Sequence, residues 1–228
     1  MQEQEVRIAV EGTDLQVSGL QLQPDKARTL CVLAHGAGAG MRHPFMESIA
    51  QGLAKRAIGT LRYQFPYMEE GKRYPNPPSL LEATVRSAVR FAADVTSNLP
   101  LLAGGKSLGG RMTSRAAAGD ALPKVRGLIF LGFPLHAPGK PGLERADHLT
   151  DITHPMLFLQ GTRDALARRD LIDTVVRGLG ERGVLHFVEG GDHSFNVLKR
   201  SGRDPTEVLD DLSEAIAEWA TRLLENPP

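Results

Sequence analysis

The chain of 228 residues is poor in cysteine, in aromatic side chains and in net charge. Its one cysteine, Cys31, excludes an internal disulfide, and its place inside an apolar run favours a small buried side chain over a reactive thiol. The 27 basic residues balance 27 acidic ones, so no overall field attracts nucleic acid or an anionic membrane. We therefore expect neither nucleic acid nor a membrane as a partner.

Long apolar runs and metal-binding motifs are also missing from the sequence. No uninterrupted apolar stretch is long enough to span a bilayer, and no apolar signal core follows the acidic residues 1–5. The H-E-x-x-H motif does not occur, and the seven histidines show no ligand spacing. We expect a cytoplasmic protein that uses no metal and no cofactor.

Apolar runs that alternate with helical patterns fill most of the chain. Hydrophobic residues make up 41% of it, enough for one large core, so we expect residues 1–228 to form a single domain. The alternation favours a mostly parallel, twisted sheet of about eight strands with helices on both faces. We expect an antiparallel hairpin at 6–10 and 15–20, strands at 29–34, 59–63, 100–104, 127–132, 155–160 and 184–188, and helices at 44–56, 80–98, 107–118, 167–179 and from 205.

The sequence Gly105-Lys106-Ser107-Leu108-Gly109 stands between one of these strands and a helix, and matches the pattern G-x-S-x-G. A strand that turns abruptly into a helix holds the serine hydroxyl above the sheet, and the two glycines let backbone pass backbone in that turn. The pattern arises by chance in roughly one in ten sequences of this composition, and a serine that caps a helix would also produce it. Ser107 is therefore a candidate nucleophile that other segments have to support.

Residues 29–40 run from an apolar strand into a loop of alternating glycine and alanine. A loop without bulky side chains lets backbone N–H groups approach a ligand oxygen. In hydrolases with this serine motif, one oxyanion donor follows the nucleophile, here Leu108, and the other lies in such a loop. We assign the second donor to Ala37, with Gly36 and Gly38 as alternatives. A phosphate cradle is disfavoured because the loop has neither the P-loop lysine nor a G-x-G-x-x-G spacing.

Two later strands end in turns that present a carboxylate and an imidazole, Asp164 and His193. Asp192 is a rival acid, but it adjoins His193 and cannot easily fold back to orient its neighbour's ring. The order Ser107, Asp164, His193 is that of the α/β-hydrolase triad, with each residue on a loop after the carboxyl end of a strand. Ligand sites of parallel sheets lie at that edge, so the three side chains can converge there.

Over nearly its whole length the chain resembles α/β-hydrolases, through His35-Gly36 and the segments 105–111, 161–164 and 191–195. It is most similar to the small, lidless branch that includes dienelactone hydrolases. Segments 62–69 and 133–141 resemble those of bacterial hydrolases related to a subunit of the non-specific-lethal histone acetyltransferase complex. Dienelactone hydrolases carry cysteine at the nucleophile position, so their substrate is not inherited by a chain that has serine there.

The resemblance implies a three-layer α/β-hydrolase fold and a serine hydrolase that cleaves a small or solvent-exposed ester or thioester. Ser107 would attack the acyl carbon, His193 would carry its proton, and Asp164 would orient the imidazole. Amidases and peptidases use the same triad, and a non-catalytic protein-interaction scaffold is a further alternative. Residues 133–153 are too few for a large cap, and the proline-rich residues 64–79 are expected to form a loop near the mouth of an open site.

Several basic side chains are candidates for contacting a small-molecule acyl substrate. His136 follows a strand on the side where the site should lie. Arg62 and Lys106, together with Arg111 and Lys140, would favour an anionic substrate if they gathered near the pocket; solvated surface charges are the simpler interpretation. The sequence does not indicate an oligomeric state.

Overall fold

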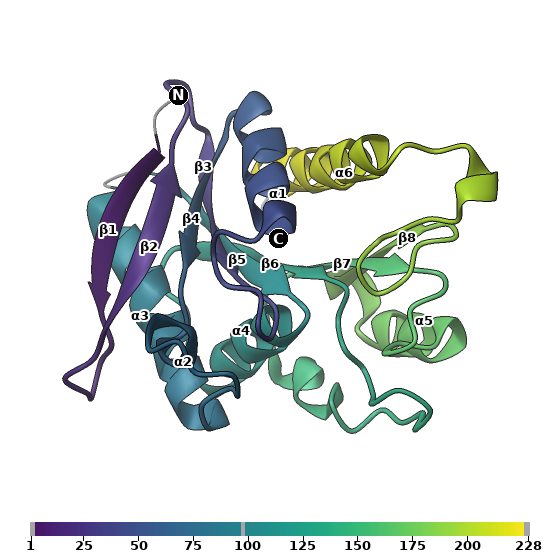
Figure 1. The fold of residues 1–228 in the computed structure, drawn as a ribbon, viewed down its shortest axis with the longest axis horizontal. Helices are drawn as coiled ribbons and strands as arrows, with labels where there is room; N and C mark the ends of the chain where they lie inside the picture. The colour runs from purple at the N-terminus through teal and green to yellow at the C-terminus, as the bar shows by residue number, and fades with distance from the viewer. Residues whose placement is uncertain (1–2, 97–98, 226–228) are drawn as a thin grey trace.

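The computed structural model describes residues 3–96 and 99–225, through which one eight-stranded sheet runs (Figure 1). The strands are β1 (Glu3–Ala9), β2 (Gln16–Leu22), β3 (Thr29–Ala34), β4 (Ile58–Tyr63), β5 (Leu101–Lys106), β6 (Val125–Leu131), β7 (Met156–Gly161) and β8 (Gly183–Val188). The helices are α1 (Pro44–Lys55), α2 (Pro66–Glu69), α3 (Pro78–Val95), α4 (Leu108–Gly119), α5 (Arg169–Gly178) and α6 (Pro205–Glu225), with short 3-10 turns at Asp147–Asp151, Gly180–Arg182 and Lys199–Ser201.

The strands lie in the order β1-β2-β4-β3-β5-β6-β7-β8. Strand β2 pairs antiparallel with both of its neighbours, and every other adjacent pair is parallel. The predicted hairpin and the mostly parallel sheet of eight strands are therefore confirmed. The parallel strands β3 to β8 bring their carboxyl ends to one edge of the sheet, where ligand sites of such sheets lie.

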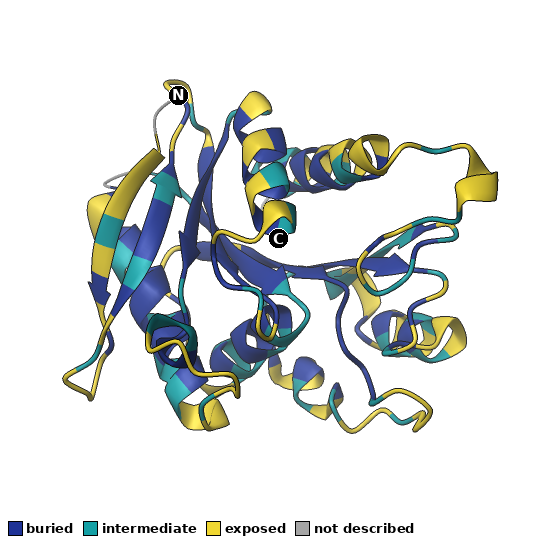
Figure 2. Cartoon of the chain, in the orientation of Figure 1, coloured by how far each residue is buried: buried dark blue, intermediate teal, exposed yellow. Residues whose placement is uncertain are grey.

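Helices cover both faces of the sheet, which gives three layers (Figure 1). Helices α1 and α6 pack together on one face, and α3, α4 and α5 lie on the other. Strand β3 is buried on both sides because its side chains alternate between the two cores: Leu30 and Val32 face one, Cys31 and Leu33 the other. Figure 2 shows the buried strands at the centre and the exposed outer sides of the helices.

Three local features differ from or refine the sequence-based expectations. The predicted loop 64–79 contains the short helix α2. The helix predicted at 80–98 begins earlier, at Pro78, and the predicted end at residue 98 lies outside the described residues. Residues 133–153 hold one 3-10 turn and build no cap domain in the described structure, as expected.

Within the described residues, no helix has the length and apolar character needed to cross a membrane.

Candidate active site

A sharp turn places Ser107 between the end of β5 and the first residue of α4. Ser107 has φ 50° and ψ −114°, a backbone conformation that residues other than glycine rarely adopt. Strain of this kind costs of order 1–3 kcal/mol and persists only where the surrounding structure enforces it. Because α4 begins directly after Ser107, the unpaired N–H groups and positive dipole end of the helix lie beside the hydroxyl.

The two glycines of the serine motif are needed because the turn passes close to β3. A Cβ added at Gly105 would lie 2.3 Å from the carbonyl oxygen of Ala34, and one at Gly109 would lie 2.4 Å from the same oxygen. Both distances are far below any real contact. The two glycines of G-x-S-x-G thus let the turn at Ser107 lie directly against β3, the strand that leads into the glycine-rich loop.

Ser107, His193 and Asp164 form a continuous chain of hydrogen bonds. His193 Nε2 lies 2.8 Å from Ser107 Oγ, and His193 Nδ1 lies 2.7 Å from Asp164 Oδ2. An ionised carboxylate only accepts hydrogen bonds, so Asp164 fixes the proton on Nδ1 and leaves Nε2 free to accept from the serine. The three residues named from the sequence are brought together in the arrangement that a nucleophile, a base and an orienting acid require.

The carboxylate of Asp164 is buried and held by further donors. Gln160 Nε2 donates to Oδ2 at 2.5 Å, and the backbone N–H of Leu166 donates to Oδ1 at 2.7 Å. The other end of the Gln160 amide accepts from the backbone N–H of Phe133. Gln160 was not among the residues predicted from the sequence, although a glutamine inside the otherwise apolar strand β7 was a signal, because a fully buried amide needs hydrogen-bond partners.

Of the two expected oxyanion donors, Leu108 directly follows Ser107, and Ala37 lines the same cavity as Ser107. Within the described structure, the N–H groups of Leu108 and Ala37 make no hydrogen bond. The carbonyl of Gly36 accepts from His35 Nδ1 at 2.7 Å, and since a trans peptide is planar, this fixes the Ala37 N–H pointing the opposite way. His35 Nε2 in turn accepts from the N–H of Phe65, and burial lowers the pKa of His35 to about 4, so the ring is neutral.

An open cavity of about 630 Å³ lies beside Ser107, between the glycine loop, the start of α1, the loop after β8 and the start of α6. Gly36, Ala37, Lys106 and His193 reach it. The rest of its lining is largely apolar and comprises Ala39, His43, Pro44, Phe45, Met46, Ser48, Leu166, Ser194, Phe195, Asn196, Pro205 and Leu209. Such a lining suits the carbon chain of a small organic ligand, with Ser107 at its wall.

A second serine–histidine pair joins α4 to the 3-10 turn Asp147–Asp151 and lacks these features. Ser114 Oγ lies 2.7 Å from His148 Nε2, but Ser114 is fully buried and also bonds the carbonyl of Arg111. Asp164 contacts His193 rather than His148. Burial and the nearby guanidinium groups of Arg115 and Arg111 lower the pKa of His148 to about 4. This pair is a structural contact with no access for a substrate.

Residues 27–221 match the family described as alpha/beta hydrolase domain. The chain belongs to this family. Solved structures agree on the fold: a dienelactone hydrolase from Anabaena variabilis superposes with a TM-score of 0.76 at 19% identity, covering 97% of each chain. Est1E from Butyrivibrio proteoclasticus with bound ferulic acid gives 0.77 at 16% identity, over 97% of this chain and 100% of the other. A serine hydrolase without lid from Xanthomonas campestris gives 0.73 at 15% identity, over 95% and 94%.

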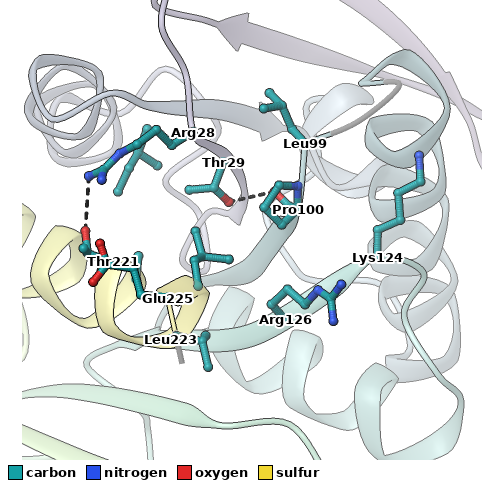
Figure 3. A pocket seen from close by; sticks show the side chains of 12 residues that line it. Arg28, Thr29, Leu99, Pro100, Lys124, Arg126, Thr221, Leu223 and Glu225 are labelled. Atoms are coloured by element: carbon teal, nitrogen blue, oxygen red, sulfur yellow. Dashed lines mark hydrogen bonds between the residues drawn. The ribbon is translucent and has the colours of Figure 1, made fainter. Parts of the chain in front are cut away.

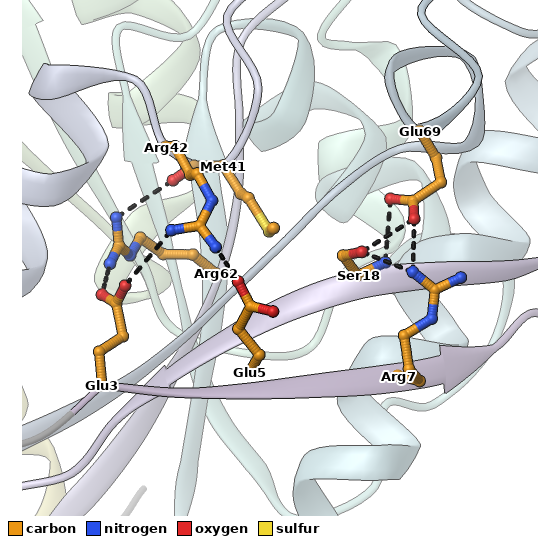
Figure 4. Close-up of polar contacts among 8 residues, drawn as sticks. All are labelled: Glu3, Glu5, Arg7, Ser18, Met41, Arg42, Arg62 and Glu69. Carbon is orange, nitrogen blue, oxygen red and sulfur yellow. Dashed lines mark hydrogen bonds and ion pairs between the residues drawn. The ribbon is translucent and has the colours of Figure 1, made fainter.

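Arg62, one of the predicted substrate contacts, does not line the cavity beside Ser107 of this hydrolase. Figure 4 shows its polar contacts instead. Its guanidinium group is buried, forms an ion pair with Glu3 and donates to the carbonyl of Met41 at 3.1 Å. Glu3 lies on β1, and Arg42 also points toward it. Arg62 therefore links the N-terminal hairpin to the end of the glycine-rich loop, a contact that only the tertiary arrangement reveals.

Residues 64–79 were expected near the mouth of the site, and they support the glycine-rich loop instead. Tyr67 accepts a hydrogen bond from the N–H of Gly38 at 3.0 Å, and Gln64 accepts from that of Met41 at 2.8 Å. None of these residues lines the cavity beside Ser107. Through these two hydrogen bonds, the segment after β4 stabilises the loop that carries Ala37.

His136 is likewise kept from the cavity by its own hydrogen bonds. Its Nδ1 contacts the carbonyl of Ala137 at 2.9 Å, and its Nε2 accepts from the N–H of Arg168 at 3.0 Å. With both ring nitrogens engaged and 6% of the residue exposed, His136 joins two loops. Arg111 and Lys140 do not line the cavity either. Of the basic candidates, only Lys106 does.

A separate cavity of about 600 Å³ lies at the opposite, amino-terminal edge of the sheet (Figure 3). Arg28, Lys124 and Arg126 stand around it, and Arg28 donates to Thr221 of α6 at 3.1 Å. No serine, histidine or cysteine lines it among the described residues. Ser107, His193 and Asp164 lie at the carboxyl edge instead. Across the described ranges, no group of three or more potential ligand side chains is placed to hold a metal ion.

Proposed function

We propose that this hydrolase cleaves small or solvent-exposed carboxylic esters or thioesters through an acyl-enzyme on Ser107. The observation that carries the proposal is the hydrogen-bonded chain from Ser107 through His193 to Asp164, at the wall of an open cavity. A serine with a purely structural role would not require a strained turn, an imidazole within hydrogen-bond distance and a buried carboxylate behind that imidazole.

In the first half of the reaction, Ser107 Oγ attacks the acyl carbon while its proton passes to His193 Nε2. The carbonyl oxygen becomes an oxyanion that accepts from the N–H groups of Leu108 and Ala37. The carbon–oxygen or carbon–sulfur bond then breaks, and the leaving group takes the proton from His193. Asp164 keeps its negative charge and stabilises the imidazolium between these two steps.

In the second half, water attacks the acyl-enzyme. His193 accepts a proton from that water, the ester bond to Ser107 Oγ breaks, and the same proton returns to the serine. The products are a carboxylic acid and an alcohol or thiol. The absence of a cap domain within the described structure leaves the cavity open, which favours small or exposed acyl groups over long buried chains.

Two other functions remain as alternatives to an esterase. An amidase or peptidase would use the same three residues, since the fold does not choose the leaving group. A non-catalytic interaction scaffold is suggested by the resemblance of segments 62–69 and 133–141 to relatives of a chromatin-complex subunit, a similarity that rests on those segments alone. A scaffold has no need of an intact triad. A cytoplasmic location and the lack of a cofactor stay predictions.

Comparison of Ser107→Ala with Ser114→Ala tests the esterase proposal. We would measure hydrolysis of acetyl and butyryl esters, the matching thioesters and the matching anilides by each protein. Removing Ser107 should lower kcat at least about a thousandfold, because the nucleophile acts together with its base. Ser114→Ala should retain activity, since Ser114 is buried in α4. Anilides cleaved as well as esters would favour the amidase, and equal low rates in wild type and Ser107→Ala would favour the scaffold.

A further inference from the structure

Lys106 has a place in the cavity that the triad does not explain. It is the last residue of β5, and because side chains alternate along a strand it points to the same face as Leu102, toward α1 and α6. Its Nζ donates to the backbone carbonyl of His193 at 2.6 Å. It also lies 5.9 Å from the ring centre of Phe45 and 5.4 Å from that of Phe195.

The two aromatic rings form one wall for this ammonium group. Phe45 stands at the start of α1 and Phe195 on the loop after β8, and their rings stack 5.8 Å apart at an angle of 9°. Cation–π attraction of this kind stabilises the ammonium group. It offsets only part of the cost of removing an ammonium group from water. The rings do not supply an opposite charge.

Lys106 has no carboxylate partner within the part of the chain that the structure describes. None of the ion pairs found there includes it, and the cavity it faces is lined by no Asp or Glu. Burial is the main influence on its pKa, which is lowered to about 8, and the more distant charges of Asp164 and Asp192 oppose the shift. Near neutral pH the wall of the cavity beside Ser107 therefore carries the charge of Lys106, and no acidic residue lines that cavity.

We propose that Lys106 recognises a carboxylate on the substrate, so that the preferred substrates are anionic esters. The proposal rests on the esterase function proposed above. An ammonium group has three N–H donors, of which one is used by the carbonyl of His193. A substrate carboxylate beside Nζ would form a charge-assisted hydrogen bond and neutralise the unpaired cation. Phe45, Phe195 and the other apolar lining would hold the carbon chain between the carboxylate and the ester.

A purely structural Lys106 would behave differently in a measurable way. If the ammonium group only held the carbonyl of His193, its removal would slow the cleavage of every ester by the same factor. If it binds a carboxylate, removal would slow anionic esters more than neutral ones. The diagnostic quantity is therefore the ratio of kcat/KM for an anionic ester to that for a neutral ester of the same shape.

Two pairs of esters measure this ratio and also show on which side of the ester the carboxylate binds. Monomethyl succinate is compared with methyl levulinate, in which a methyl ketone replaces the carboxylate of the acyl group. Acetoxyacetate is compared with acetoxyacetone, in which the same replacement is made in the leaving group. Acid release is followed for wild type and Lys106→Met, so the intrinsic reactivity of each ester cancels between the two proteins.

The proposal predicts that the ratio for at least one pair falls roughly ten- to hundredfold in Lys106→Met, the range for losing a hydrogen bond to a charged group. Equal losses for both members of each pair would overturn it and leave the esterase function standing. If wild type cleaves none of the four esters and Ser107 resists an active-site phosphonate probe, both proposals fail.

Wild-type protein alone provides a second test, which does not depend on the folding of the variant. Lys106 is charged below its pKa of about 8 and neutral above it. Besides Asp164 and Asp192, the titratable groups around it are the imidazoles of His193 and His43. The anionic-to-neutral ratio should therefore fall as the pH rises through about 8. A ratio that stays constant through that range contradicts the proposal.

Discussion

The side-chain amide of Gln160 donates to Asp164 Oδ2, the same carboxylate oxygen that accepts from His193 Nδ1. The other end of the amide is anchored by the N–H of Phe133, and Gln160, Asp164 and Phe133 are all buried. One glutamine thus connects the end of β6 to the acid of the triad. Its amide fixes the rotation of the carboxylate and, through it, the plane of the imidazole.

Replacement of Gln160 should impair catalysis without changing substrate contacts. In Gln160→Met both hydrogen bonds are lost, and in Gln160→Glu a second carboxylate faces Asp164. We expect kcat to fall roughly tenfold or more with little change in KM. The free energy of unfolding should fall by about 1–3 kcal/mol, because buried polar groups lose their hydrogen-bond partners. Steady-state kinetics and urea unfolding measure both. Unchanged kcat in a folded Gln160→Met would show that the amide does not position the triad.

Asp164→Asn and Asp192→Asn form a matched pair, because each changes one carboxylate near His193 into an amide. Asn at 164 would offer a donor where His193 Nδ1–H needs an acceptor, so kcat should fall by about 10⁴, as it does when a triad acid is replaced in this way. Asp192 accepts from the N–H groups of Ser194 and Asn196 through Oδ1, an oxygen that Asn keeps. We expect less than about a tenfold loss there. Comparable losses in both variants would argue against Asp164 as the acid.

The backbone strain at Ser107 predicts an order of stability between two inactive variants. Ser107→Ala and Ser107→Gly both lose the hydroxyl, but only glycine adopts φ 50° and ψ −114° without steric cost. Ser107→Gly should unfold at a higher temperature than Ser107→Ala, with a difference in free energy of about 1 kcal/mol. Thermal denaturation followed by circular dichroism decides this. Equal midpoints would mean that the turn stores no strain.

Burial of neutral histidines predicts that the protein loses stability in mild acid. The pKa of His35 is lowered from 6.5 to about 4 in the folded chain, mainly by burial. Between these values the unfolded chain binds a proton that the folded chain does not, so the free energy of unfolding should decrease as the pH falls from about 6.5 toward 4. His148 shifts in the same direction. Urea unfolding at several pH values should show this slope, reduced in His35→Gln; an unchanged slope in that variant would mean that His35 does not cause it.

The fold and the convergence of Ser107, Asp164 and His193 could be predicted because their signals are local. Ser107, Asp164 and His193 each follow an apolar strand through a glycine-containing turn, and parallel strands bring their carboxyl ends to one edge of the sheet. The hairpin and the parallel strands were visible as runs of alternating or continuous apolar residues. Helix ends were less certain: α3 begins at a proline two residues before its predicted start.

The surroundings of the triad could not be predicted because they depend on contacts between segments far apart in the sequence. Arg62 lies in the buried strand β4, where it pairs with Glu3 and lies away from the cavity. His136 comes to the correct edge of the sheet but is bonded to Arg168. Lys106 was one of several basic candidates, and only the positions of Phe45 and Phe195 single it out.

The most direct test of the central assignment is the reaction of the purified protein with a fluorophosphonate probe, followed by peptide mass mapping. If Ser107 is an activated nucleophile, we expect a single modified peptide with the phosphonate on Ser107, and no label in Ser107→Ala. Thermal unfolding confirms that both proteins are folded. An unmodified Ser107 in folded wild-type protein, or a label on Ser114 instead, would contradict the assignment of Ser107, His193 and Asp164 as the catalytic residues.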